Sequence, residues 1–176
     1  IGNGVELMSL TGGGDASAEM ALIVDSVQNA SARIRFFRIA FGAAPTGQAF
    51  PRREVLKVLS DMAAGGRISY DWQCLGDASR ADVRTCFLLF MCFETAMIHG
   101  GDITVIRDAT HWTLTATADL LRFDDGLWNG LDGGTVVSTS PAQVQFALLP
   151  QVMQGTGDVL RIQRSDTSLV ATFGPA

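Results

Sequence analysis

Apolar residues recur at alternating steps of three and four along Ser17–Phe41, and this spacing predicts a long amphipathic helix. They form the a/d seam typical of a helical bundle. The seam consists of Met20, Ile23, Val27, Ala30, Ile34, Phe37 and Phe41. Val24, Phe36 and Ile39 lie off this seam, so the helix is apolar over more of its circumference than one partner requires. We therefore expect packing from two sides, most simply in a four-helix bundle made by two chains.

A second helical segment precedes this one. Ile1, Val5 and Met8 have helical spacing, and the glycines of Thr11–Gly14 end the helix before the next one begins. Since the connection is short, the two helices predict an antiparallel hairpin. The chain begins at Ile1 within this pattern and without a methionine, so we expect further helical residues upstream.

The segment Ala43–Ala49 contains Pro45 and Gly47 and predicts a linker. We place a domain boundary there, between a helical hairpin (residues 1–44) and an α/β domain (residues 45–176). In the second domain, helices are predicted at Pro51–Met62, from Ser79 to about Ile98 and from Ser140 to about Gln154. Strands are predicted at Arg67–Gln73, Asp102–Arg107, His111–Ala118, Val159–Arg164 and Ser168–Phe173. The fold class is thus α+β, and the second domain is an α/β sandwich with helices on one face of a mixed sheet.

Composition and charge narrow the choice of partners. The net charge of -5 and the pI near 4.8 argue against a nucleic-acid partner, because phosphate binding requires a basic face. The longest strongly apolar run, Cys86–Phe93, is too short to cross a bilayer, and no secretory signal is visible. The cysteines have no metal-ligand spacing and predict reduced core thiols; they are Cys74, Cys86 and Cys92. We expect a cytoplasmic protein with no membrane partner.

A helical hairpin followed by an α/β sandwich is also the order of elements in the transmitter core of a histidine kinase, which is an analogy of fold. In that superfamily the buried helix carries a magnesium-binding Asn and a Lys, and here Thr95 and Ile98 stand in those positions. The adenine-binding Asp-x-Gly-x-Gly motif is matched by Asp119–Phe123, which lacks both glycines. A Mg-ATP site without its metal ligand and its glycines should not work. The sequence therefore predicts a kinase-like fold that is not a kinase, with neither a nucleotide cofactor nor a metal.

Four segments resemble the ChpT-type histidine phosphotransferases of alphaproteobacteria: Asn3–Leu7, Ser31–Ala44, Tyr70–Gln73 and Ala171–Ala176. The resemblance implies a homodimeric hairpin that relays phosphate from the receiver domain of a hybrid histidine kinase to response regulators, in a multistep phosphorelay of the cell-cycle type. It also implies a degenerate ATPase-like (Bergerat) domain that helps to dock these partners, while the receiver brings the magnesium. The family's phosphoacceptor His would precede Ile1, so no residue of this chain is expected to be the nucleophile.

The resemblance also implies a receiver-docking surface. On the first helix it comprises Gly2, Asn3, Glu6 and Leu7, although Leu7 could equally be buried in the bundle. If the hairpin turns near Gly13, the missing His lies level with about Arg35. Arg35 and Arg38 then lie close to the phosphoryl group or to the receiver's acidic pocket, and guanidinium groups suit both. The alternative is that these arginines are solvated and pair with neighbouring carboxylates.

Other candidate groups favour structural interpretations. His99 and His111 lack a neighbouring motif that would mark a phosphoacceptor. Asp124 and Asp125 lie in a glycine-rich segment that predicts an irregular, solvated turn. The tryptophans are expected in the core or an interface; they are Trp72, Trp112 and Trp128.

The sequence thus predicts a phosphotransfer protein rather than an ATP-dependent kinase. A competing hypothesis is a dimeric scaffold that sequesters a receiver or kinase domain without phosphoryl chemistry. A divergent ATP-binding kinase is a more distant one.

Overall fold

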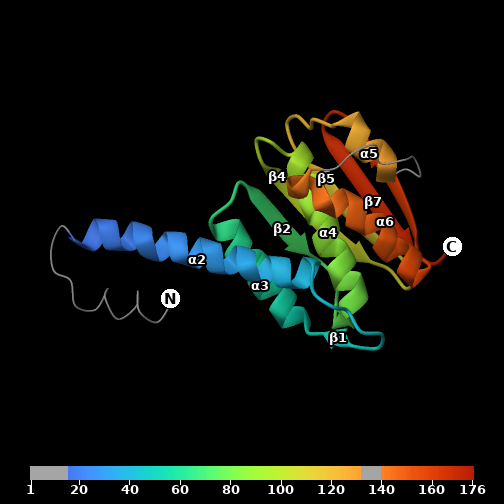
Figure 1. Ribbon diagram of the computed structural model, residues 1–176, viewed down its shortest axis with the longest axis horizontal. Helices are drawn as coiled ribbons and strands as arrows, with labels where there is room; N and C mark the ends of the chain where they lie inside the picture. The colour runs from blue at the N-terminus through green and yellow to red at the C-terminus, as the bar shows by residue number, and fades with distance from the viewer. Residues whose placement is uncertain (1–15, 132–139) are drawn as a thin grey trace.

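The computed structural model describes residues 16–131 and 140–176 (Figure 1). The predicted first helix at Ile1–Leu10 and the turn at Thr11–Gly14 lie outside the described residues. The hairpin therefore stays a prediction. The second helix is confirmed, and α2 spans Ala16–Ala40. Its N-terminal half projects away from the rest of the molecule, while its C-terminal half packs against α3 and α4.

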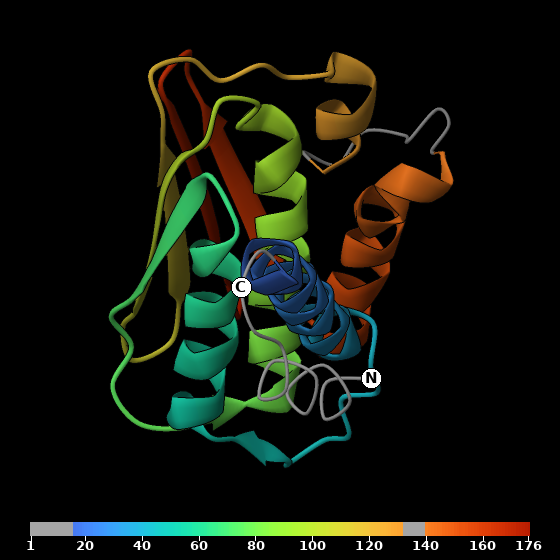
Figure 2. The same ribbon diagram turned by 90° about the vertical axis from the view of Figure 1, so that its left-hand side faces the viewer.

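The remaining elements build a mixed five-stranded sheet with its helices on one face, as predicted (Figure 2). The strand order is β2 (Ile68–Trp72), β4 (Gly101–Arg107), β5 (Trp112–Thr117), β7 (Ser168–Gly174) and β6 (Val159–Arg164). The pair β2–β4 is parallel and the other pairs are antiparallel. The covering helices are α3 (Arg52–Ala64), α4 (Arg80–Ala96) and α6 (Val144–Thr156), and a short 3-10 helix precedes α6 at Pro141–Gln143.

The local sequence explains where these helices begin. Pro51 precedes the first turn of α3 with an extended backbone, where its missing N–H costs no hydrogen bond. The Ser79 hydroxyl accepts a hydrogen bond from the Asp82 N–H at 3.0 Å and caps α4. Ser140 and Gln143 form a capping box at the entry to α6. The cap and proline positions therefore predicted the starts of α3 and α4 to within one residue, whereas a 3-10 helix forms at the predicted start of α6, which itself begins at Val144.

The core lies between the sheet and its helices. The segment Phe87–Phe93 of α4 is buried apart from Met91, which confirms the prediction of a helix that is apolar all round. On the strands, buried residues alternate with half-exposed ones, and the half-exposed positions on the open face include Thr104, Thr113 and Thr115. This alternation explains why one face of the sheet accepts helices and the other does not.

The structure corrects one interpretation of the sequence. Asp124 and Asp125 do not lie in an irregular turn, because Asp125–Leu131 forms the short helix α5. The Asp124 carboxylate accepts a hydrogen bond from the Gly126 N–H at 2.9 Å, and its carbonyl accepts from Leu127 and Trp128. Asp124 is therefore the N-cap residue of this helix. The sequence also did not predict the small β1–β3 pair, Ala49–Phe50 with Ala78–Ser79.

The domain boundary remains a prediction. Residues 41–48 are neither helix nor strand, as expected for a linker. Yet Phe36, Ile39 and Ala40 at the end of α2 belong to the same buried cluster as the α/β core. The C-terminal part of α2 is therefore packed onto the α/β domain.

Candidate functional site

The helix α2 presents two apolar faces. Ala32, Phe36, Ile39 and Ala40 are buried, and the Phe36 ring lies 4.7 Å from the Phe87 ring of α4. The seam predicted from the sequence faces away from this core, and its residues Ile34 and Phe37 are 59% and 36% exposed. Residues two apart on a helix lie about 200° apart, so the Phe36 and Ile34 side chains leave the helix in nearly opposite directions. Packing from two sides was the prediction, and the structure supplies one of the two partners.

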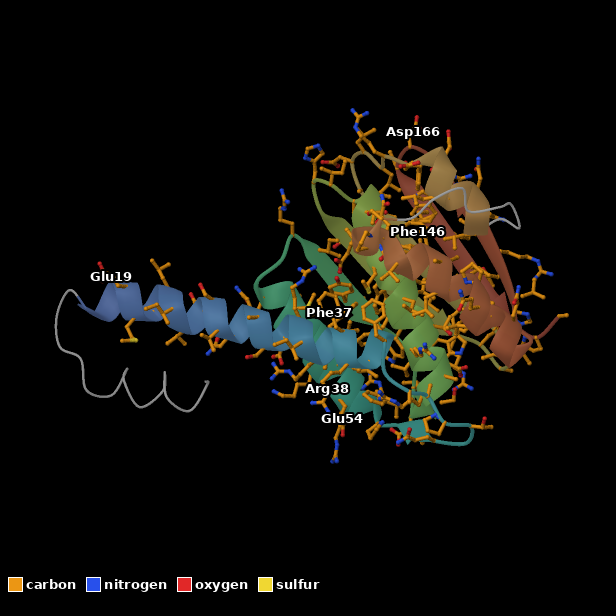
Figure 3. All side chains as sticks on the ribbon, in the orientation of Figure 1. Glu19, Phe37, Arg38, Glu54, Phe146 and Asp166 are labelled. Atoms are coloured by element: carbon orange, nitrogen blue, oxygen red, sulfur yellow. The ribbon has the colours of Figure 1, made fainter. Side chains whose placement is uncertain are left out.

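The exposed face continues into a groove of about 840 Å³ between α2 and α3. Ile34 and Phe37 of α2 line it together with Phe41, which directly follows the helix, and with Phe50 and Val58. Figure 3 shows Phe37 and Arg38 on α2 and Glu54 on α3 beside this groove. An exposed apolar surface of this kind, bordered by charged side chains, is typical of an interaction site.

The three arginines of α2 have different surroundings. Arg35 pairs with Asp61 of α3 at 2.8 Å, and Arg33 lies 3.6 Å from Glu94 of α4. Both therefore have neighbouring carboxylates as partners, which the alternative interpretation expected of Arg35 and Arg38. The Arg38 guanidinium is exposed and has neither a hydrogen bond nor an ion pair within residues 16–131 and 140–176. Arg38 is thus the arginine that remains available to an anionic partner.

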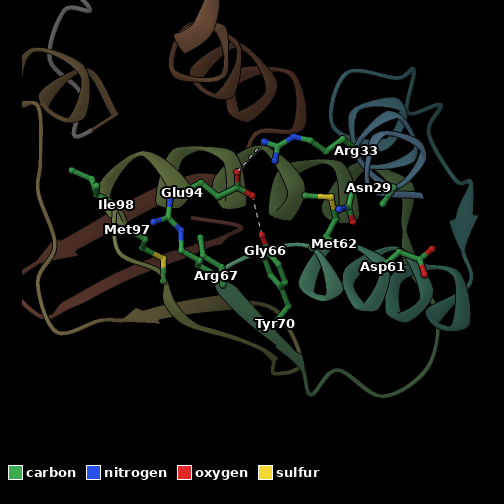
Figure 4. A pocket seen from close by; sticks show the side chains of 13 residues that line it. Asn29, Arg33, Asp61, Met62, Gly66, Arg67, Tyr70, Glu94, Met97 and Ile98 are labelled. Atoms are coloured by element: carbon green, nitrogen blue, oxygen red, sulfur yellow. Dashed lines mark hydrogen bonds and ion pairs between the residues drawn. The ribbon is translucent and has the colours of Figure 1, made fainter. Parts of the chain in front are cut away.

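A pocket of about 490 Å³ lies where α2 leaves the domain (Figure 4). The Tyr70 hydroxyl donates a hydrogen bond of 2.8 Å to Glu94, whose other carboxylate oxygen faces Arg33. Burial and the Glu94 carboxylate raise the pKa of Tyr70, so this hydroxyl stays protonated and remains a donor. This chain of contacts ties α2 to the sheet and to α4.

The comparisons with known proteins agree with this arrangement. Residues 52–168 match the family model described as the histidine phosphotransferase C-terminal domain. The chain belongs to the histidine phosphotransferase family. The resemblance drawn from the sequence is thereby confirmed.

The individual relatives align with very different shares of this chain. It is 61% identical over 44 residues to the protein phosphotransferase ChpT of Brucella abortus (strain 2308). That match covers 25% of this chain and spans 20% of the Brucella protein. Among solved structures, a bacterial phosphotransferase aligns with a TM-score of 0.74 and 22% identity, over 98% of this chain and 85% of that one. The latter match shows a shared fold.

The fold is also that of histidine kinases. The blue-light-activated histidine kinase of Erythrobacter litoralis EL346 aligns with a TM-score of 0.50 and 15% identity. The alignment covers 90% of this chain and 59% of the kinase. A mixed α+β architecture of the histidine-kinase type is thereby confirmed, while the dimeric bundle stays a prediction.

The positions equated with nucleotide-binding motifs lie close together in this phosphotransferase fold. The Arg122 N–H donates to the Ala96 carbonyl at 3.0 Å and holds the segment after Asp119 against the end of α4. Thr95, in the place of the magnesium-binding Asn, donates its hydroxyl to the Cys92 carbonyl at 2.7 Å. No group of three or more metal-ligating side chains occurs in the described part of the chain.

A buried aromatic cluster lies beside these positions. Trp128 of α5 is 5.3 Å from the rings of Phe123 and Phe146 and 6.4 Å from Phe93, and only Phe123 of the four is partly exposed. The sequence missed α5 and with it this cluster. The apolar spacing of Leu127, Trp128 and Leu131 behind an Asp cap was the signal that could have found it.

The remaining candidates are the two histidines, which lie in irregular segments, and the residues of the first helix, which lie outside the described residues. Gly2, Asn3, Glu6 and Leu7 belong to the latter group. His111 lies in a turn, where its backbone N–H and that of Thr110 donate to Asp108 and lower the pKa of that carboxyl. His99 is exposed just beyond α4.

The cysteines and tryptophans are core residues, as predicted. All six side chains are buried: Cys74, Cys86, Cys92, Trp72, Trp112 and Trp128. Burial raises the pKa of Cys74 to about 11 and those of Cys86 and Cys92 well above the usual range, so the three thiols stay protonated near neutral pH. Among the described helices, none is long and apolar enough to cross a membrane.

Proposed function

We propose that this chain acts in a dimeric histidine phosphotransfer protein that relays phosphoryl groups between receiver domains. A hybrid histidine kinase would be the donor and a response regulator the acceptor, in the cytoplasm. The observation that carries the proposal is the two-faced helix α2, with one face packed on an ATPase-like domain and the opposite face left exposed. A helix that packs between a domain and a second chain needs an apolar face toward each of them.

The exposed seam supports a homodimer through a four-helix bundle. In this arrangement the seam residues of two hairpins would pack together. The first helix, including Gly2, Asn3, Glu6 and Leu7, would run antiparallel to α2 and carry the phosphoacceptor His upstream of Ile1.

The chemistry requires little of the protein beyond positioning. In each step the imidazole and a receiver aspartate exchange a phosphoryl group: the P–O bond of the acyl phosphate breaks as a P–N bond forms, and the reverse follows. The receiver supplies the Mg²⁺. The Arg38 guanidinium, which is exposed on α2 and has no partner within the described residues, would attract the receiver's acidic surface or the phosphoryl oxygens. Arg35 lies on the same side of the helix and would also bind the receiver, by exchanging its ion pair with Asp61 for one with the partner.

We expect the purified protein to bind no Mg-ATP in isothermal titration calorimetry at millimolar nucleotide. Thr95 stands in the place of the metal-binding Asn, and its hydroxyl donates a hydrogen bond to the Cys92 carbonyl. Magnesium-dependent binding of ATP would contradict this prediction and would favour a divergent kinase instead.

A scaffold that binds receivers without phosphoryl chemistry would use the same exposed surfaces. Incubating the full-length protein with a phosphorylated receiver separates the two functions, because a relay removes the phosphoryl group from the receiver and a scaffold leaves it there.

A further inference from the structure

Two arginines of α4 hold the C-terminal end of α2. Arg80 donates from Nε to the Ala43 carbonyl at 3.0 Å and from Nη2 to the Arg38 carbonyl at 3.3 Å. Arg84 donates from Nε to the Ala40 carbonyl at 3.3 Å. The last carbonyls of a helix have no partner within the helix, and a cation is favoured at this end of the helix dipole. The α/β domain therefore caps the helix that precedes it.

The surroundings of Arg80 are shaped for this contact. Its guanidinium lies 5.0 Å from the centre of the Phe50 ring, which holds it from the other side. Gly42 leaves the space that the guanidinium needs. A Cβ at this position would collide with the Arg38 carbonyl and lie 3.0 Å from Arg80 Nη2. The glycine that ends the helix is thus also required for its attachment to α4.

Further contacts extend the attachment along α2. Phe36 packs on Phe87, and the Arg35–Asp61 and Arg33–Glu94 pairs lie within the same turn, toward the N-terminus. The residues that follow α2, although irregular, are tied down by Arg80 at Ala43. A free hinge between the helix and the domain would require these carbonyls to lose their partners.

We propose that Arg80, assisted by Arg84, is a positioning residue that fixes the α/β domain on α2 in one orientation, and that phosphoryl transfer depends on this orientation. The inference rests on the proposed function. A receiver that docks level with Arg35 and Arg38 also meets the adjoining surface of the domain, because these arginines and Arg80 border the same groove. In-line transfer tolerates little misplacement of the reacting groups, so a domain that rotates on α2 lowers the rate.

The test compares Arg80→Ala, Arg80→Lys and Gly42→Ala in the full-length protein, with Arg161→Ala as a control. Arg161 is exposed on β6, the edge strand at the other end of the sheet from β2, so its loss removes the same charge elsewhere. Hydrogen exchange of the amides of residues 40–48 reports the attachment. Loss of two charge-assisted hydrogen bonds is expected to raise exchange there by about tenfold or more. Exchange in β4, β5 and β7 stays unchanged.

The second readout is kcat/KM for phosphoryl transfer from a phosphorylated receiver. Arg80→Ala and Gly42→Ala are expected to lower it by about tenfold. Arg80→Lys restores part of it, because an ammonium group can still reach one carbonyl, and Arg161→Ala matches the wild type. Rescue by lysine separates a positioning role from a general loss of stability.

Exchange of residues 40–48 that is unchanged in both Arg80→Ala and Gly42→Ala would overturn the inference. So would faster exchange with an unchanged transfer rate. A wild-type protein that accepts no phosphoryl group from any receiver would instead overturn the proposed function, and the kinetic half of this inference with it.

Discussion

Replacing Ile34 with aspartate is expected to convert the full-length protein from a dimer into a monomer. Ile34 is 59% exposed, more than the other large aliphatic and aromatic side chains of the seam, and leaves α2 almost opposite to the buried Phe36. The substitution therefore spares the attachment to the α/β domain. A carboxylate forced into an apolar bundle costs several kcal/mol, and ~4 kcal/mol corresponds to about a thousandfold in the dimer dissociation constant. Sedimentation equilibrium at micromolar concentration measures the change.

Leu22→Asp is the matched control for this experiment. Leu22 is also an exposed apolar residue of α2, at 68%, but it does not belong to the seam. The same substitution there is expected to leave the dimer intact. Retention of the dimer by Ile34→Asp, or a wild-type protein that sediments as a monomer, would contradict a bundle formed through this seam.

Reversing the charge of Arg38 is expected to weaken receiver binding by about tenfold or more, which corresponds to ~1.4 kcal/mol or more. The Arg38 side chain makes no ion pair or hydrogen bond within the described residues, so Arg38→Glu breaks none there. It places an anion where the receiver's acidic surface is proposed to approach. Calorimetry with a receiver domain measures the affinity, and the thermal midpoint of the variant should equal that of the wild type.

Arg35→Glu provides an informative comparison. It is also expected to weaken receiver binding, but the new carboxylate would face Asp61, and like charges at this distance lower the stability as well. A loss of affinity in both variants, with a stability change in Arg35→Glu alone, would assign the docking role to the α2 surface. Equal affinity of Arg38→Glu and the wild type would remove Arg38 from that surface.

The fold could be predicted from the sequence wherever a local signal was strong. Ser79 and the Ser140-Pro141 pair fix helix starts through hydrogen bonds and backbone restriction within one turn. Strands such as Trp112–Thr117 alternate with period two, because one face of the sheet is buried. These constraints act between neighbours along the chain, so the pattern alone was sufficient.

The contacts that define the candidate site join residues that lie far apart in the sequence. Tyr70 and Glu94 are 24 residues apart, and Arg84 reaches a carbonyl 44 residues earlier in the chain. No periodicity encodes such pairs, since they exist only after the helices have packed. The sequence identified α2 as a helix with two apolar faces. It could not show which face the domain takes, nor that Arg35 pairs with Asp61 while the Arg38 side chain has no partner among the described residues.

The packing also suggests why a phosphotransferase keeps an ATPase-like domain. The domain buries one face of α2, caps its C-terminal end and places the groove of Phe37 and Phe50 beside the arginines. None of these contributions requires a nucleotide. On the proposed function, the domain serves as the support of a phosphotransfer helix.

The most direct test of the central claim is phosphoryl transfer with the full-length protein in the absence of ATP. A labelled receiver of a hybrid kinase is mixed with the protein, followed by a response regulator. The account predicts that label passes through the protein to the regulator, by way of an acid-labile and base-stable intermediate located upstream of Ile1. Tight receiver binding without any transfer of label would contradict it and would show that the kinase-like fold serves here as a scaffold.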